Sequence, residues 1–424
     1  MFVGKFIRYK RKELGLTQEQ LADGICSITY ISKVENNTIK PKQDILSHIC
    51  KKLDLEPLGL KGDNNQGLIN LMKDVYYGIV DRINLHEISC RLGEIQEKIK
   101  DKIDPNLQIG YKLILAQYFL YQRDERKAME KLDEAKQNLS YLSKEFRFWF
   151  FNSYGLYQYL FGSPLDSLNS YKKAKEIMNE IDLEQAQANI NYQLGLVNAQ
   201  LMNINDSIFY TKKALDIYNN QLHFQRILDC NILIGINYNR IEKHSLAEKQ
   251  FLKLLTISAP INDQKYLGKI YHNLGYTYSL KREYDLATQY LKKALEHKKS
   301  PKERLSSMYV LAYVFKKNNQ LELQLEYIKK GIKLSEEENN YAFYYKFKIM
   351  KLLSLENQET KSLFKTLEKE ALPYYQKYNP SLYQELNLLL ATLYKKNMLY
   401  KKSTHYYERY LESTNENSIK EFLY

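Results

Sequence analysis

Apolar residues recur every three to four positions along most of this chain, which is the period of an amphipathic helix. The pattern starts at the N-terminus, where Phe2, Phe6, Ile7 and Leu14 share this spacing and Gly15 follows them. Because glycine adopts the left-handed conformation that ends many helices, Gly15 is expected to stop the first helix. The same period over the first sixty residues predicts five short helices.

Capping residues mark where the next helices begin. Thr17 followed by Gln20 is a capping-box pattern, in which the hydroxyl accepts a backbone N–H and the amide side chain reaches back. A second helix is therefore expected over about 18–23. Gly24 makes the following turn, and Ser27 caps a third helix. Two helices joined by a tight glycine turn form a helix-turn-helix unit.

This segment resembles the Xre/Cro/repressor-type DNA-binding domain. The resemblance covers about 60 residues and lies in Thr17–Ala22, Ile31–Asn36, Pro41 and the apolar positions Ile45, Leu46, Ile49 and Leu53. The stretch from Thr17 to Glu35 is one residue shorter than the commonest form, with Ile25-Cys26 in the turn. That shortened turn is similar to the one in PlcR-type and NprR-type regulators of Gram-positive bacteria.

The resemblance implies which residues contact DNA. In such domains the third helix enters the major groove, where Ser, Thr and Lys donate to base edges and Ile contacts a thymine methyl. Positions flanking that helix hold the phosphate backbone. Glu35 is expected to make an internal contact. The residues expected to bind DNA are Thr17, Gln18, Ser27, Ile28, Thr29, Tyr30, Ser32, Lys33 and Lys40 or Lys42.

From about residue 66 the chain repeats itself every forty residues. Glycines recur at positions 155, 195, 235 and 275. Twelve residues after each glycine comes a small residue (Ser167, Ser207, Ala247 and Ala287), and nineteen after come Ala174, Ala214, Leu254 and Ala294. This is the tetratricopeptide pattern, in which small residues allow two helices of a hairpin to cross closely. Degenerate copies extend the pattern on both sides.

The predicted fold is therefore all-α, a five-helix lambda-repressor-like domain followed by a right-handed tetratricopeptide superhelix of about nine helical hairpins. We expect the DNA-binding domain over 1–62, a linker over 63–70, the repeat domain over 71–412 and a C-terminal tail over 413–424.

The concave face of such an array suits an extended peptide. An Asn amide both donates and accepts, so it can hold the main chain of a peptide. Since the sequence is rich in Asn throughout, solvated positions are the alternative for each residue. The candidates on the first helices of the hairpins are Asn152, Asn191, Tyr192, Asn231, Asn239, His272 and Asn273.

The combination of an Xre-type domain with tetratricopeptide repeats resembles the family of quorum-sensing regulators grouped as Rap, Rgg, NprR, PlcR and PrgX, and its length favours the NprR type. The resemblance implies a cytoplasmic regulator that binds double-stranded promoter DNA, self-associates, and is switched by an imported signalling oligopeptide on the concave face. It also implies, as an alternative, a Rap-like activity that promotes dephosphorylation of a sporulation phosphorelay response regulator. Gln96, Gln108 and Gln117 are the candidates for orienting water in that activity.

Charge agrees with an anionic partner near the N-terminus. The chain of 424 residues has 63 Lys and Arg against 50 Asp and Glu, a net charge of +13. Residues 1–62 hold 11 of the basic and 7 of the acidic residues, so positive charge is denser there than in the rest. The basic cluster Lys5, Arg8, Lys10, Arg11 and Lys12 has a solvated helix face as its alternative explanation.

Other classes of protein are disfavoured. The charged start carries no secretory signal, no apolar run reaches the roughly 20 residues of a membrane span, and the four cysteines have no C-x-x-C spacing, which favours free and mostly buried thiols. The sequence has no Walker, G-x-G-x-x-G, G-x-S-x-G or H-E-x-x-H motif. We therefore expect no catalytic residues, no metal and no cofactor. A protein-contact scaffold acting on a phosphorelay, and a phage-encoded relative reading a phage peptide, remain the other interpretations.

Overall fold

In the residues that it describes, the structure, a computed structural model, has helices joined by turns and short irregular segments. The described residues are 3–36, 38–54, 65–81, 85–100, 104–139, 142–181, 184–258, 263–354 and 360–414. No strand occurs among them, which confirms the predicted all-α class. Contacts divide the chain into two compact units, 1–237 and 238–424.

Four helices form the N-terminal domain: α1 (Val3–Glu13), α2 (Gln18–Ala22), α3 (Ile28–Glu35) and α4 (Gln43–Lys52). A fifth was predicted before residue 62, and residues 55–64, where it would fall, lie outside the described part of the chain.

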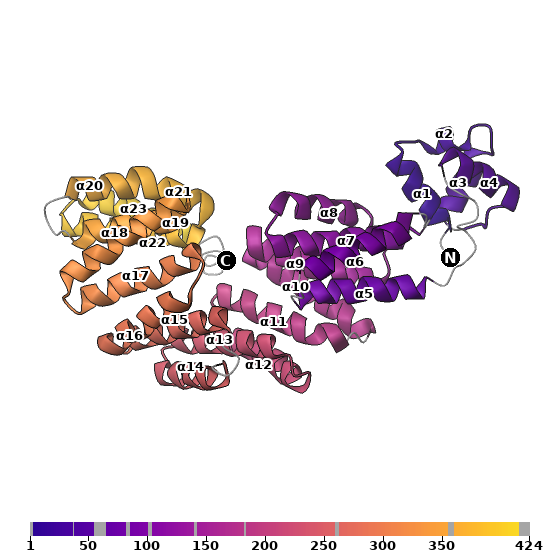
Figure 1. The fold of residues 1–424 in the computed structure, drawn as a ribbon. Helices are drawn as coiled ribbons and strands as arrows, with labels where there is room; N and C mark the ends of the chain where they lie inside the picture. The colour runs from indigo at the N-terminus through magenta and orange to yellow at the C-terminus, as the bar shows by residue number, and fades with distance from the viewer. Residues whose placement is uncertain are drawn as a thin grey trace, which may run out of the picture. The chain divides into compact units, whose positions relative to one another are not determined.

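The rest of unit 1 consists of longer helices packed in pairs, α7 on α8, α9 on α10 and α11 on α12 (Figure 1). Their bounds are α5 (Gln66–Val80), α6 (Leu85–Lys100), α7 (Pro105–Gln122), α8 (Glu125–Gln137), α9 (Lys144–Phe161), α10 (Pro164–Ile181), α11 (Glu184–Gln200) and α12 (Ile204–Asn220). The next helix, α13 (Phe224–Arg240), contains the boundary between the units.

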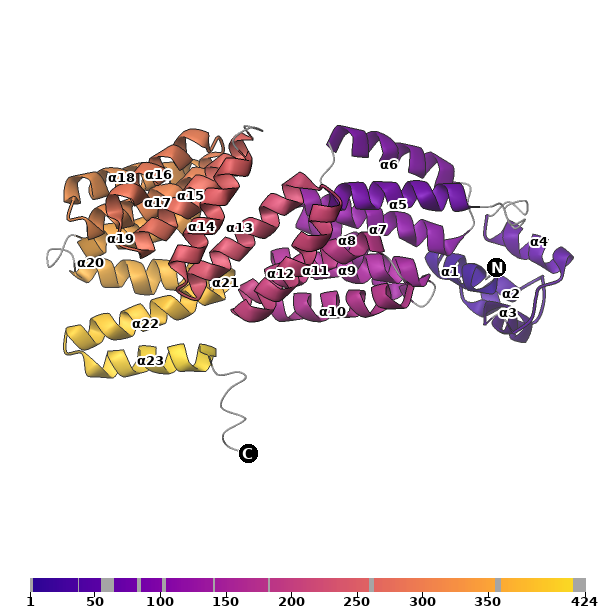
Figure 2. The ribbon, with the colours of Figure 1, turned by 90° about the horizontal axis from the view of Figure 1, so that it is seen from below.

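Unit 2 continues the helical hairpins, with α15 packed on α16, α17 on α18 and α22 on α23 (Figure 2). Its helices are α14 (His244–Ser258), α15 (Gln264–Leu280), α16 (Tyr284–His297), α17 (Pro301–Lys317), α18 (Leu321–Glu337), α19 (Tyr341–Ser354), α20 (Thr360–Lys365), the π-helical η4 (Thr366–Ala371), α21 (Leu372–Tyr378), α22 (Pro380–Lys396) and α23 (Tyr400–Thr414).

Small residues lie where the helices of a hairpin cross, as the forty-residue period predicted. In α10 the Ser167 hydroxyl donates to the Gly155 carbonyl of α9 at 2.8 Å, and in α12 Ser207 donates to the Gly195 carbonyl of α11 at 2.6 Å. A Cβ added to Gly275 would lie 2.5 Å from Leu291 Cγ. The twelve-residue spacing therefore marks close helix contact, which confirms the tetratricopeptide prediction at these crossings.

Two details differ from the sequence predictions. Residues 66–70, predicted as the end of a linker, are the first turns of α5, because Leu68 is buried in the core of unit 1. Of the four free cysteines only Cys50 and Cys230 are buried, and Cys90 is exposed because it lies on the outer face of α6. No described helix has both the length and the apolar character needed to cross a bilayer.

Candidate DNA-binding and peptide-binding surfaces

The helix-turn-helix domain is held in shape by the caps that its sequence predicted. Thr17 Oγ1 accepts from Gln20 N at 3.1 Å while Gln20 Oε1 accepts from Thr17 N at 2.7 Å, so the capping box of α2 is complete. Gly24 takes a φ of +73° in the turn. Ser27 Oγ then accepts from Tyr30 N at 3.2 Å and caps α3. These bonds fix where α3 begins and how it leaves the turn.

A buried ion pair anchors the other end of α3. The Arg11 guanidinium donates to both carboxylate oxygens of Glu35, at 2.6 and 3.0 Å, and Gln18 Nε2 donates to the same carboxylate at 2.8 Å. Glu35 is 1% exposed, which agrees with the internal role predicted for it. Arg11, counted among the basic residues of α1, is also buried, so it is not available to a phosphate in this conformation.

The start of α3 presents uncovered side chains. Ile28 is 47% exposed, and Thr29 and Lys33 are also exposed, while Ile31 and Val34 on the opposite side of α3 are fully buried. The exposed Ile28 side chain is free to contact an apolar group such as a thymine methyl. Ile28, Thr29 and Lys33, three of the predicted base-reading residues, therefore lie on the open side of α3.

The remaining predicted DNA-binding residues lie around that face. Tyr30 and Ser32 are half-buried, and the Tyr30 hydroxyl accepts from Lys42 N at 2.9 Å, which ties α3 to the start of α4. Thr17 and Lys40 are exposed, and Lys42 is exposed beside the tyrosine. The side chains of Thr17, Lys40 and Lys42 are therefore accessible to a partner.

In unit 1 the predicted peptide-binding residues lie on α9, α11 and α13. Asn152 Nδ2 donates to the Tyr76 hydroxyl at 2.8 Å, and Asn231 Nδ2 donates to the Ile227 carbonyl at 2.7 Å. Asn191 and Tyr192 are buried on α11. The amides of Asn152 and Asn231 thus each donate one hydrogen bond within the chain, to a hydroxyl of a neighbouring helix and to a carbonyl of the same helix.

In unit 2 the predicted residues are also bonded internally. Asn239 Nδ2 donates to Thr277 Oγ1 at 2.9 Å, and Asn273 Nδ2 donates to the Lys269 carbonyl at 2.9 Å. His272 Nδ1 lies 3.0 Å from Ser307 Oγ. Burial, with the nearby Lys298 charge, lowers the pKa of His272 to about 3, so the imidazole is neutral near pH 7.

Sequence reasoning missed a charged group on α13. Arg226 is 3% exposed and Asp229 is 7% exposed, with Arg226 Nη1 3.8 Å from the aspartate and its guanidinium 5.6 Å from the centre of the Tyr192 ring. Arg226 also donates to the Val80 carbonyl at the end of α5. Its Nε has no hydrogen-bond partner among the described residues. The available signal was an arginine and an aspartate three residues apart, a spacing that puts both on one side of a helix.

The same part of unit 1 contains a titratable pair. Burial raises the pKa of Asp81, while His223 and Arg226 oppose that rise. His223 Nε2 lies 3.6 Å from the Asp81 carboxylate. The end of α5 thus meets the start of α13 through charged groups. No cluster of three or more His, Cys, Asp or Glu side chains in the described ranges has metal-binding geometry.

Comparisons with known proteins agree with both halves of this description. A helix-turn-helix family profile matches residues 7–60, and a tetratricopeptide-repeat profile matches residues 268–300 and 305–338. The chain is similar to the transcriptional activator NprA of Geobacillus stearothermophilus, with 28% identity over 408 residues that cover 92% of this chain and 97% of NprA.

Two further similarities are to a solved structure and to a protein of Bacillus subtilis. The solved structure of NprR in complex with its cognate peptide NprX covers 82% of this chain and 100% of its own, with a TM-score of 0.65 and 23% identity, which shows a shared fold. Response regulator aspartate phosphatase I of Bacillus subtilis is 25% identical over 245 residues, which cover 55% of this chain and 62% of that protein. The architecture of this chain is thus NprR-like, with a helix-turn-helix domain ahead of tetratricopeptide repeats.

Proposed function

We propose that this protein is an NprR-like transcription regulator that binds promoter DNA through α3 and responds to a short signalling peptide bound by its repeats. The observation that carries the proposal is the open face of α3, where Ile28, Thr29 and Lys33 stay uncovered while both ends of the helix are fixed by Ser27 and Glu35. A helix held in this way can enter the major groove without rearrangement.

The similarity to the transcriptional activator NprA spans nearly the whole length of both chains, which supports the same activity here. The domain boundaries that we propose are 1–62 for DNA binding and, because α5 begins at Gln66, 66–412 for peptide sensing and self-association. The same proposal includes a two-fold dimer on DNA, in which two copies of α3 read half-sites about one helical turn apart. A cytoplasmic location and the absence of a cofactor are part of the same proposal.

For the peptide we propose contacts on the first helices of the hairpins, which we take separately as α9, α11 and α13 in unit 1 and α15 in unit 2. NprR, a protein of this fold, forms a complex with its cognate peptide NprX, which supports a peptide as the ligand here. The Nε of Arg226 and the Oδ1 of Asn237 are buried and have no hydrogen-bond partner among the described residues. Unpartnered buried polar groups are costly, so a peptide whose binding opens the helix packing around them would gain hydrogen bonds to its carbonyl and N–H groups. Asn191, Tyr192, Asn231, Asn239, His272 and Asn273 are the other proposed contacts.

The test is a fluorescence anisotropy titration of the full chain on DNA from the regions flanking its own gene. It is run at two salt concentrations, with and without synthetic peptides taken from the C-terminus of adjacent small open reading frames. Specific, salt-sensitive binding that one peptide changes is the expected result. Binding that is equal on unrelated DNA, or the same with every peptide, would overturn the regulator proposal.

A second candidate function is Rap-like stimulation of response-regulator dephosphorylation. It rests on the similarity to aspartate phosphatase I and on the position of Gln96, which is exposed on α6. Gln117 is buried and accepts from Ser153 at 2.8 Å, and Gln108 donates to the Ile99 carbonyl, so of the three glutamines Gln96 is the one that we propose to orient water. The test is dephosphorylation of a phosphorylated sporulation response regulator by the wild-type chain and by Gln96→Ala. No acceleration by the wild-type chain would remove this function.

A further inference from the structure

Helix α1 belongs to two hydrophobic cores at once. Ile7, 1% exposed, packs in the helix-turn-helix core with Leu21 and Ile31, whereas Tyr9, 6% exposed, packs in the core of the repeats. Residues two apart on a helix point to nearly opposite sides. One side of α1 therefore faces α3, and the other faces the first repeats.

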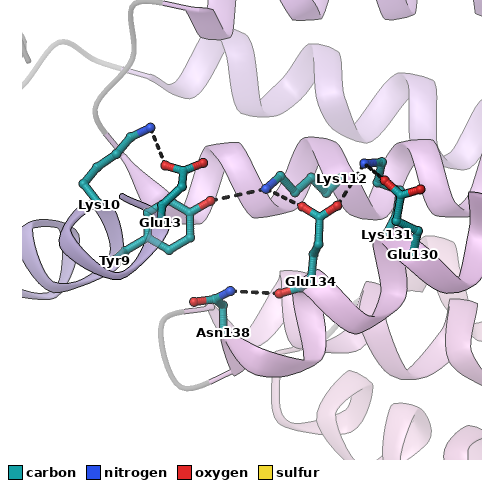
Figure 3. Close-up of polar contacts among 8 residues, drawn as sticks. All are labelled: Tyr9, Lys10, Glu13, Lys112, Glu130, Lys131, Glu134 and Asn138. Atoms are coloured by element: carbon teal, nitrogen blue, oxygen red, sulfur yellow. Dashed lines mark hydrogen bonds and ion pairs between the residues drawn. The ribbon is translucent and has the colours of Figure 1, made fainter. Parts of the chain in front are cut away.

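A polar contact fixes the outer side of α1 to α7. Lys112 Nζ donates to the Tyr9 hydroxyl at 3.3 Å and pairs with the Glu134 carboxylate of α8 at 2.6 Å (Figure 3). Lys131 donates to the second Glu134 oxygen at 2.9 Å, and Asn138 Nδ2 donates to the Glu134 backbone carbonyl at 2.8 Å. Lys112 is thus positioned by its ion pair with α8 and donates a hydrogen bond to Tyr9 of α1.

The partners of Lys112 also determine its charge. Burial lowers its pKa, but Glu134 and Tyr9 more than compensate, so the pKa of Lys112 stays above its usual value. The ammonium is therefore charged at every pH at which the protein would work. The contact between α1 and α7 therefore does not change with pH through the protonation of Lys112.

The inner side of α1 is fixed as firmly. Arg11, two residues after Tyr9, pairs with Glu35 at the last turn of α3. Helix α1 thus joins two sets of contacts, from Tyr9 to Lys112 and Glu134 on one side and from Arg11 to Glu35 on the other. Meanwhile the DNA-facing side of α3 stays open, with Ile28 47% exposed. The docked domain can therefore still reach a major groove.

We propose that α1 is a coupling helix in which Tyr9 and Lys112 are positioning residues: they fix the direction of α3 relative to the first repeats and thereby set the spacing of the two half-sites that a dimer reads. This inference rests on the proposed function. A dimer whose reading helices are rigidly attached accepts one spacing, because half-sites lie on one face of the duplex only when separated by whole turns. A dimer with loosely attached domains accepts several.

The test compares the full-length wild-type chain with Tyr9→Phe, which removes only the hydroxyl, and with Lys112→Met, which removes the ammonium. Lys127→Met is the matched control, since Lys127 lies on α8 and its ion pair is a local one with Asp124 at 3.2 Å. The probes are DNA duplexes selected by the wild-type chain, carrying one half-site or two half-sites at varied spacing. Hydrogen exchange of α1 and α7 in the absence of DNA reports the docking itself.

Both test variants should bind a single half-site within about two-fold of wild type, while the preference for the best spacing over one shifted by roughly 5 bp, half a turn, falls about five-fold. Exchange of α1 should speed up, with α2 and α3 unchanged, and the control should match wild type. Wild-type spacing preference or wild-type α1 exchange in both variants would overturn the inference, as would an equal loss on single half-sites. If the wild-type chain binds no DNA specifically, the proposed function fails and the inference falls with it.

Discussion

Arg11 and Glu35 are joined by two charge-assisted hydrogen bonds inside the helix-turn-helix domain, with oxygen–nitrogen distances of 2.6 and 3.0 Å. The pair links the last turn of α1 to the last residue of α3, and its two members are 24 positions apart in sequence. A buried pair of this kind contributes modestly when intact, because both charges lose their hydration. Replacing only one member of the pair is costly, since the other charge is then left buried without its partner.

Arg11→Met should therefore destabilise the helix-turn-helix domain by about 3–5 kcal/mol. The double variant Arg11→Met, Glu35→Leu should recover much of this loss, because no charge then remains buried. Hydrogen exchange of α2 and α3 in the full chain is the measurement. Lys10→Met is the control: it breaks the exposed Lys10–Glu13 pair and should cost less than about 1 kcal/mol. Equal effects of Arg11→Met and Lys10→Met would contradict the burial argument.

The crossing of α15 and α16 gives a second prediction. A Cβ on Gly275 would meet Leu291 Cγ at 2.5 Å and the Ala287 carbonyl at 3.1 Å, and the backbone of α16 cannot move aside easily. Gly275→Ala should destabilise unit 2 by about 1–3 kcal/mol. Gly93, inside α6, has no described atom within 4 Å of the same added carbon. Gly93→Ala should stabilise its helix by about 0.5–1 kcal/mol.

Urea unfolding followed by helix-resolved hydrogen exchange separates these two effects, because repeat arrays lose structure in parts. A stable Gly275→Ala protein with unchanged exchange in α15 and α16 would show that the hairpin tolerates wider helix separation than the crossing distances indicate.

Local features of this fold were readable from the sequence, and distant contacts were not. The capping box at Thr17, the turn at Gly24 and the forty-residue glycine period each depend on residues a few positions apart, so their spacing predicts the structure directly. The ion pair of Arg11 and the docking of Tyr9 on Lys112 join residues 24 and 103 positions apart. Nothing in the local pattern distinguishes them from solvated charges on a helix face.

The peptide surface illustrates the same limit. Asn231 lies on α13 and Asn273 on α15, but whether an amide bonds its own helix depends on its rotamer, and in the structure both donate to the carbonyl four residues earlier. The burial of Arg226 could not be predicted from the local sequence, because its partner, the Val80 carbonyl, lies 146 positions away.

A third prediction concerns Lys33 on the open face of α3. Because a lysine that neutralises a phosphate or donates to a base releases a counterion, Lys33→Ala should weaken DNA binding and reduce the slope of log affinity against log salt by about 1. Lys333→Ala is the matched control. The Lys333 side chain on α18 is 79% exposed, and this substitution removes the same charge outside the helix-turn-helix domain. The measurement is the DNA affinity of both variants and of wild type, taken by fluorescence anisotropy over a range of salt concentrations. Equal slopes for both would place Lys33 outside the DNA interface.

The last prediction follows from His272. Burial lowers its pKa to about 3 in the folded chain, against an ordinary value near 6.5. Between these two pH values the unfolded chain binds a proton that the folded chain does not, so the free energy of unfolding of unit 2 falls as the pH drops below about 6.5. At pH 5 this histidine should account for a loss of about 1–2 kcal/mol relative to pH 7.5.

His272→Gln keeps a polar group near the Ser307 hydroxyl but cannot titrate, so its unfolding free energy should change less between pH 7.5 and pH 5 than that of wild type. The measurement is the urea midpoint of unit 2, followed through hydrogen exchange of α15 and α17 at both pH values. His48 serves as the comparison, because it is exposed on α4 and His48→Gln should leave the pH dependence of unit 2 unaltered. Should wild type and His272→Gln lose stability equally, the buried imidazole must take up a proton in the folded chain, and its hydrogen bond to Ser307 would then be made by the charged ring.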